Sequence, residues 1–161
     1  MCSSDLVVPH PAGAPPIDRI HSDMLEPLRG SLAEMLAPAG IAVDRRGSSD
    51  LVAVRESVAR KFSGNALRVR RHGVLYHGTL LDDFDIPLIS RVLRHPPREP
   101  DYRRRRPHGE FVTNLNLGRA VLESLVRRAF GATPARADWP RDRVARLVCE
   151  RYRRADWTHR L

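Results

Sequence analysis

Apolar residues recur at helical spacing over residues 17–37, and this pattern predicts an amphipathic helix. Pro27 should bend or split the helix. Pro38 and Gly40 should end it, because proline lacks a backbone N–H and glycine readily adopts the left-handed cap conformation. The apolar face of this helix consists of Ile20, Met24, Leu28, Leu32, Met35 and Leu36.

The next part of the chain has β character. Short strands are predicted at 41–43, 51–54 and 57–62, and a polar turn from Asp44 to Asp50 separates the first two. The third strand ends at a Ser-Gly-Asn sequence, which is typical of a β-turn.

A hairpin and a short helix follow this turn. Apolar and polar residues alternate over 66–71 and 74–81, and Arg71-His72-Gly73 between them is a tight-turn signal, so the two stretches should pair as antiparallel strands. A helix fits residues 86–94, and Asp85 is its expected N-cap.

The stretch 95–110 contains four prolines and a run of four arginines, and it shows no periodicity. A loop of this length is typical of a functional or mobile segment. Two helices should complete the chain, one near 118–130 and one that begins at Pro140. In the last helix, the residues expected to face inward are Val144, Leu147 and Val148.

Length and composition favour one domain. The chain has 161 residues, of which 42% are hydrophobic, enough for a single core. Residues 9–16 are rich in proline and glycine, so we predict an irregular lead over 1–16, a core over 17–130, and a linker with a C-terminal helix over 131–161. The fold class is α+β, with a mixed, largely antiparallel sheet flanked by helices.

The charge is uneven along the chain. The formal net charge is +9, and residues 98–161 alone hold 16 basic and 8 acidic residues. Nucleic acid, an anionic membrane surface or an acidic protein could each use such a field. Aromatic residues are scarce at 6% and are not interleaved with the arginines, so binding of single-stranded nucleic acid through stacking is not expected.

The chain carries neither a basic-then-apolar start nor an apolar run near the roughly 20 residues of a membrane span. Its two cysteines fit a reducing compartment, so we expect a cytoplasmic protein. Cys2 should lie in a frayed terminus and Cys149 should be a buried, inert thiol. The histidines and cysteines show no zinc spacing.

Lys61 is the only lysine beside 27 arginines. Coding bias alone could produce this ratio, but a lysine is a compact, mobile point charge that arginine does not replace. Lys61 begins the sequence Lys-Phe-Ser-Gly-Asn-Ala. A turn made of Ser63, Gly64 and Asn65 would expose backbone N–H groups, and the neighbouring ammonium could serve a phosphate or a carbonyl oxygen. The same residues could equally form an ordinary β-turn.

Three further features are weak when taken alone. His77 and Gly78 lie within a predicted strand and could face a cleft or simply pack there. Asp50 could bind a metal or cap a turn. The run Arg103 to Arg106 could bind a phosphate or steer an acidic partner, but a solvated run is the simplest interpretation.

Six short motifs stand in order along the chain: GSSDL, RKFSGNA, LYHGTLL, DFD, PPREPDYRRRRPH and FVTNL. Taken together, they resemble the lipoate-protein ligase family of the biotin and lipoate ligase superfamily. The resemblance is specific over about 41–117 and fainter over 17–40 and 118–130.

This resemblance implies a fold like the class II synthetase catalytic domains. It also implies activation of lipoate by ATP to lipoyl-AMP, followed by transfer to one lysine of a lipoyl acceptor domain. Acceptors of this kind occur in 2-oxoacid dehydrogenases and in the glycine cleavage H protein; nucleic acid and membrane are not expected partners.

The resemblance also implies roles for individual residues. Lys61 would be the catalytic ammonium, and Asp50 would lie near Mg²⁺. Residues of the strand after Lys61 and of the neighbouring strand would contact the nucleotide and substrate, namely Ser63, Gly64, Asn65, Ala66, His77, Gly78 and Thr79.

Family members begin with strands and a glycine-rich, RxxGGG-like loop that does not precede Pro9 here, so the domain is expected to be incomplete at its N-terminus. Two alternatives remain open. One is an octanoyl or lipoyl transferase that needs no ATP, although no cysteine stands where a nucleophile would be expected. The other is a non-catalytic relative that binds an acidic partner or nucleic acid.

Overall fold

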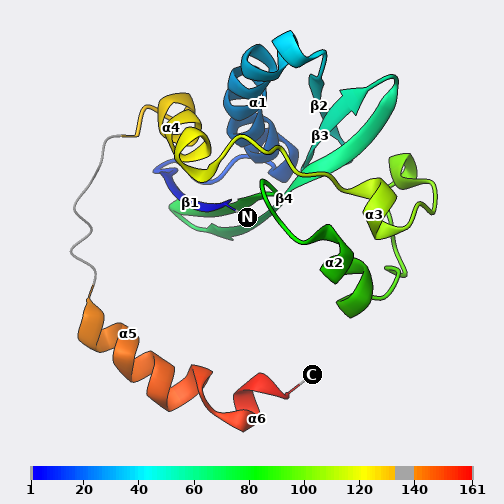
Figure 1. Ribbon diagram of the computed structural model, residues 1–161. Coiled ribbons are helices and arrows are strands. Elements are labelled where there is room, and N and C mark those ends of the chain that lie inside the picture. Colours follow the sequence, from blue (N-terminus) through cyan, green and yellow to red (C-terminus); the bar gives the residue numbers. More distant parts are fainter. Residues whose placement is uncertain (1, 133–139, 161) are drawn as a thin grey trace.

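A five-stranded antiparallel sheet is the centre of the computed structural model, which describes residues 2–132 and 140–160 (Figure 1). The strand order is β1-β5-β4-β3-β2, so β4 is the central strand and pairs with β5 on one side and β3 on the other. The strands are β1 (Cys2–Pro9), β2 (Ala42–Arg46), β3 (Asp50–Arg55), β4 (Val58–Arg70) and β5 (Gly73–Leu80).

Two helices, α1 and α4, pack against each other on one face of this sheet (Figure 1). We call this the helix face and the opposite side the outer face. The helices are α1 (Ile17–Leu36), α2 (Ile86–Val92), α3 (His108–Phe111), α4 (Arg119–Ala129), α5 (Arg141–Leu147) and α6 (Ala155–Thr158), with shorter helical turns at η1 (Ala37–Ala39), η2 (Asp101–Arg103) and η3 (Val148–Tyr152).

The predicted first helix is confirmed with nearly the predicted bounds. It continues through Pro27 as one helix, so the proline does not split it. The 3₁₀ turn η1, which contains Pro38, follows, and Gly40 closes this turn with φ of 69°, the left-handed conformation that favours glycine. The buried residues of α1 are Ile20, His21, Leu25, Leu28, Leu32 and Leu36.

One polar pair lies inside the contact between α1 and the sheet. The ring of buried His21 and the hydroxyl of buried Tyr76 are 2.9 Å apart, at Nδ1 and Oη. Burial, together with the positive charge of Arg45, lowers the pKa of His21, and burial raises the pKa of Tyr76 to about 12. Both side chains are therefore held in their neutral forms near neutral pH.

The predicted hairpin is confirmed as β4 and β5, which pair from Ser63–Leu80 to Arg70–Gly73. Asp85 caps α2 as predicted, because its carboxylate accepts a hydrogen bond from the Leu88 N–H. A second carboxylate, Asp82, is buried and accepts hydrogen bonds from the N–H groups of Leu117 and Gly118. This contact fixes the start of α4.

The irregular lead predicted over 1–16 is wrong for residues 2–9, which form the edge strand β1 against β5. Cys2 is therefore not frayed: it pairs with Leu80 and is 9% exposed. The strand signal is weak in the sequence, because a polar run over residues 3–5 is followed by an apolar run over 6–8 without alternation, and two of the inward positions are Cys2 and Ser4.

The C-terminal helix begins after Pro140 as predicted, but its inward face is wrong. Val144 and Leu147 are exposed, and Cys149 is exposed rather than buried. Part of the linker predicted before this helix lies outside the described residues. Over the ranges that the structure describes, no helix is long and apolar enough to cross a membrane.

Candidate functional site

A β-bulge at Phe62 sets the geometry around Lys61. Leu51 pairs with Ser63, but the next residue, Val52, pairs with Lys61, so β4 carries one extra residue at this point. Phe62 and Ser63 are both buried, at 0% and 1% exposed. Because the bulge changes the alternation of side chains, Lys61 joins Gly64 on the outer face. The predicted Ser-Gly-Asn turn is therefore wrong: these residues continue β4.

The ammonium of Lys61 is held by Asp50. Lys61 Nζ lies 2.7 Å from Asp50 Oδ1, and the two side chains are 28% and 13% exposed. The second oxygen of the same carboxylate, Oδ2, accepts a hydrogen bond of 2.7 Å from the hydroxyl of Tyr102. Burial and this bond to Asp50 raise the pKa of Tyr102, so the hydroxyl keeps its proton and donates.

Asp50, the residue predicted to lie near Mg²⁺, has both carboxylate oxygens engaged, one by Lys61 and one by Tyr102. Mg²⁺ is bound in proteins through carboxylate oxygens, so it would compete with these two partners for Asp50. Among the residues that the structure describes, no group of three or more histidine, cysteine, aspartate or glutamate side chains could hold a metal ion.

Gly64 lies directly beside the ammonium on the outer face. A Cβ atom at Gly64 would lie 3.5 Å from Lys61 Nζ and 3.8 Å from Thr79 Oγ1. Thr79 is the cross-strand partner of Gly64, and its hydroxyl donates to the Gly64 carbonyl over 3.1 Å. The structure thus brings together three of the predicted residues, Lys61, Gly64 and Thr79.

Ala66 and His77 form the next cross-strand pair on the same face. The His77 ring is half-exposed, and its Nδ1 lies 2.8 Å from Asp5 Oδ1 on β1. The imidazole is therefore oriented by a carboxylate that the sequence pattern did not single out, because β1 was not recognised.

Ser63, Asn65 and Gly78 lie on the opposite, helix face. They border a small cavity together with residues of α1, among them Leu25. The Asn65 amide donates to the Ser49 carbonyl over 2.7 Å and to Ser63 Oγ over 3.1 Å. The structure therefore separates these three predicted residues from Lys61.

The FVTNL segment, residues 111–115, contacts the backbone of Lys61. Val112 forms an isolated parallel bridge with Lys61, and the Thr113 N–H donates to the Lys61 carbonyl over 2.9 Å. Further along, the Leu115 N–H donates to the Leu81 carbonyl. The segment therefore fixes the backbone at the bulge, a role that the sequence word alone does not reveal.

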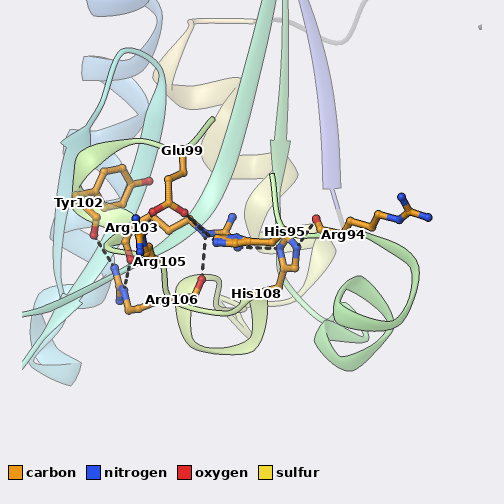
Figure 2. Close-up of polar contacts among 8 residues, drawn as sticks. All are labelled: Arg94, His95, Glu99, Tyr102, Arg103, Arg105, Arg106 and His108. Carbon is orange, nitrogen blue, oxygen red and sulfur yellow. Dashed lines mark hydrogen bonds and ion pairs between the residues drawn. The ribbon is translucent and has the colours of Figure 1, made fainter. Parts of the chain in front are cut away.

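The loop 95–110 is ordered by its own side chains (Figure 2). Arg103, expected to be solvated, is 4% exposed: its Nε lies 3.4 Å from Glu99 Oε2, and its guanidinium lies 4.7 Å from the centre of the Phe111 ring. The solvated interpretation of this arginine is therefore wrong. The loop contributes Tyr102 to the site, and no periodicity in the sequence indicated this contact.

A groove next to Tyr102 is rich in positive charge. It has a volume of about 330 Å³ and is lined by Arg46, Arg104, Arg106 and Tyr102 together with residues 57–59. Lys61 and Gly64 do not line this groove. At the site itself, an ammonium beside a side-chain-free strand position can stabilise negative charge on a phosphate or a carbonyl oxygen.

Comparison with known proteins gives a family match and several similar proteins, whose names carry two different activities. A family model described as the lipoyl protein ligase A/B catalytic domain matches residues 14–129. Octanoyltransferase LipM from Symbiobacterium thermophilum is 42% identical over 81 residues, which is 48% of this chain and 29% of that protein.

Solved structures share the fold. A bi-partite lipoate protein ligase from Thermoplasma acidophilum, described with its E2 lipoyl domain, has a TM-score of 0.73 at 20% identity and covers 96% of this chain and 62% of its own. A lipoate-protein ligase A bound with ATP has a TM-score of 0.72 at 16% identity, covering 96% of this chain and 63% of its own. The predicted α+β fold is confirmed, and the chain spans less than two thirds of each relative.

Proposed function

Because the chain belongs to the family of lipoyl protein ligase A/B catalytic domains, we propose that it acts as a lipoate-protein ligase. In this proposal the lipoate carboxylate attacks the α-phosphorus of ATP, the bond between the α- and β-phosphates breaks, and pyrophosphate leaves. The ε-amine of an acceptor lysine then attacks the carbonyl carbon of lipoyl-AMP, loses a proton and displaces AMP.

The observation that carries this proposal is the ammonium of Lys61, positioned on the outer face beside Gly64. Negative charge develops on the phosphate in the first step and on the carbonyl oxygen in the second. A fixed positive charge stabilises both, since a preorganised charge requires no reorganisation at the moment of reaction. Lys61 is the catalytic residue in this proposal.

The remaining predicted residues divide between two roles. Gly64, Ala66, His77 and Thr79 share the outer face with Lys61 and would line the bound nucleotide and acyl group. Ser63, Asn65 and Gly78 lie on the helix face. In this proposal they support the strands rather than contact the substrate.

The proposed cofactor and substrate are ATP and lipoate. In support, one neighbour is a lipoate-protein ligase A bound with ATP, and a putative lipoate protein ligase from Thermoplasma acidophilum is described with bound lipoic acid. Mg²⁺, the proposed metal, would be held largely by the substrate phosphates and water, together with at most one or two protein carboxylates.

The proposed acceptors are lipoyl domains of 2-oxoacid dehydrogenases or the glycine cleavage H protein. The Thermoplasma acidophilum neighbour described with its E2 lipoyl domain supports this choice. Both cysteines are free, which is consistent with the reducing conditions of the cytoplasm, the proposed location.

The test is lipoate-dependent exchange between ATP and pyrophosphate. Lys61→Ala should lower the exchange rate by at least about a hundredfold, the loss typical of a missing charge-stabilising donor. Arg60→Ala is the matched control, because it removes one positive charge from the adjacent, exposed position of β4 and should retain activity. Exchange that is undiminished in Lys61→Ala would refute the assigned role.

A second candidate is octanoyl transfer without ATP, which the likeness to octanoyltransferase LipM favours. The cysteines give it little support. Burial raises the pKa of Cys2, which disfavours the reactive thiolate, and Cys149 lies beyond the matched residues 14–129. Transfer from octanoyl-carrier protein in the absence of nucleotide would select this activity.

A further inference from the structure

The carboxylate of Asp50 joins two side chains from distant parts of the chain. Its Oδ1 is 2.7 Å from the Lys61 ammonium and its Oδ2 is 2.7 Å from the Tyr102 hydroxyl. We propose that Asp50 and Tyr102 are positioning residues for Lys61, and that Asp50 serves the ammonium instead of serving as a metal ligand. The effect of this positioning on catalysis rests on the proposed function.

The surroundings of Tyr102 hold its ring in place. The ring lies 5.2 Å from that of buried Phe111, centre to centre. The backbone carbonyl of Tyr102 accepts a hydrogen bond of 3.0 Å from Arg106 Nη2 (Figure 2). Contacts at the ring and at the backbone therefore hold Tyr102 in the position from which its hydroxyl donates to Asp50.

Buried Arg103 organises the loop on the other side of Tyr102. Its Nε donates to the Arg106 carbonyl over 3.0 Å and lies 3.4 Å from Glu99 Oε2 (Figure 2). Glu99 Oε1 in turn accepts a hydrogen bond of 2.7 Å from the Arg105 N–H. These contacts close the loop on itself around a buried guanidinium.

The loop keeps this shape at a conformational cost. Arg104 and Arg105 have φ of 51° and 57°, a left-handed conformation that non-glycine residues seldom adopt. Strain of this kind persists only where surrounding contacts over-determine the backbone, and it concentrates at functional sites. Together, these contacts place the Tyr102 hydroxyl on the carboxylate of Asp50, which holds the Lys61 ammonium. A loop that served only to connect α2 and α3 would not require this strained conformation.

The lone lysine makes the geometry directly measurable. Lys61 is the only lysine of the 161 residues, so protein labelled with ¹⁵N-lysine has one side-chain ammonium signal in an NMR spectrum. In the wild-type chain the ion pair with Asp50 should slow the exchange of these protons with water. Tyr102→Phe should shift this signal and increase the exchange rate severalfold, and Asp50→Asn should do the same.

Tyr152→Phe is the matched control, because it removes a tyrosine hydroxyl from an exposed position near the C-terminus. It should leave the ammonium signal unchanged. An unchanged signal in Tyr102→Phe, in a variant whose backbone spectrum is otherwise native, would overturn the inference. A shift of the wild-type ammonium signal on addition of Mg²⁺ alone would also overturn it, because Asp50 would then bind the metal.

The activity measurement separates this inference from the proposed function. In ATP–pyrophosphate exchange, Tyr102→Phe should lower kcat about tenfold or more, as expected for a misplaced catalytic group, and leave KM for lipoate within about twofold. A raised KM with unchanged kcat would contradict the positioning role. Absence of exchange in the wild-type chain would refute the proposed function and leave the NMR test in force.

Discussion

Gly78→Ala should destabilise the protein, although alanine is normally the better residue in a strand. A Cβ atom at Gly78 would lie 2.7 Å from Asn65 Oδ1, closer than such atoms approach. The Asn65 amide has little freedom to yield, because it donates to the Ser49 carbonyl and to Ser63 Oγ. Relief of the overlap therefore requires loss of these bonds, at about 0.5–1.5 kcal/mol each, or displacement of a packed strand, at about 1–3 kcal/mol.

We expect Gly78→Ala to lower the free energy of unfolding by about 2 kcal/mol after the favourable alanine propensity of up to about 1 kcal/mol is included. Urea denaturation followed by circular dichroism measures this change. Gly30→Ala is the control: nothing lies within 4 Å of a Cβ at this position of α1, so alanine should stabilise by about 1 kcal/mol.

A double mutant tests the assigned cause. Asn65→Ala removes the atom with which the new methyl group collides, so Gly78→Ala should have little further effect in the Asn65→Ala background. Equal destabilisation by Gly78→Ala in both backgrounds would refute the reasoning. The same result would show that Gly78 is required for a reason other than the close approach of Asn65.

Two further predictions concern buried polar groups. Burial and the positive charge of Arg45 lower the pKa of His21 from its ordinary 6.5, and the opposing effect of Asp18 is smaller. The folded state therefore binds this proton less readily than the unfolded chain, so stability should fall as the pH decreases below about 6.5. His21→Gln should reduce this pH dependence, as measured by urea titrations at several pH values. Asp82→Ala should lower the free energy of unfolding by about 2–3 kcal/mol, because the N–H groups of Leu117 and Gly118, just before α4, lose their acceptor. A loss below about 0.5 kcal/mol in the same assay would contradict the role of Asp82 in holding the backbone before α4.

Periodicity predicted the elements whose apolar residues are numerous. Helix α1 and the β4–β5 hairpin are confirmed because their buried positions repeat over many residues. Strand β1 is not indicated by periodicity, because its polar and apolar residues stand in two separate runs instead of alternating, and two of its inward side chains, Cys2 and Ser4, are small. Val144 and Leu147 follow the helical pattern as well, yet they are exposed. Periodicity shows that a helix has an apolar face, but it does not show whether another element covers that face.

The candidate site was predictable as a set of residues but not as an arrangement. The order of the sequence motifs indicates that Lys61, Asp50 and the glycine-containing strands belong to the site. Which side chains share a face depends on the bulge at Phe62, and a bulge depends on pairing with β3 rather than on the local sequence. The contribution of Tyr102 depends on a contact across 52 positions of the chain, which no local pattern contains.

The extra residue at Phe62 constrains how this stretch of the chain can change during evolution. In a regular strand, residues three apart point to opposite faces, so the loss of the bulge at unchanged length would place the Lys61 amine on the face opposite Gly64. Substitutions that favour a regular ladder between β3 and β4 are therefore expected to be tolerated less well than substitutions of exposed residues nearby. Pairing with β3, at this one position, decides which face carries the amine.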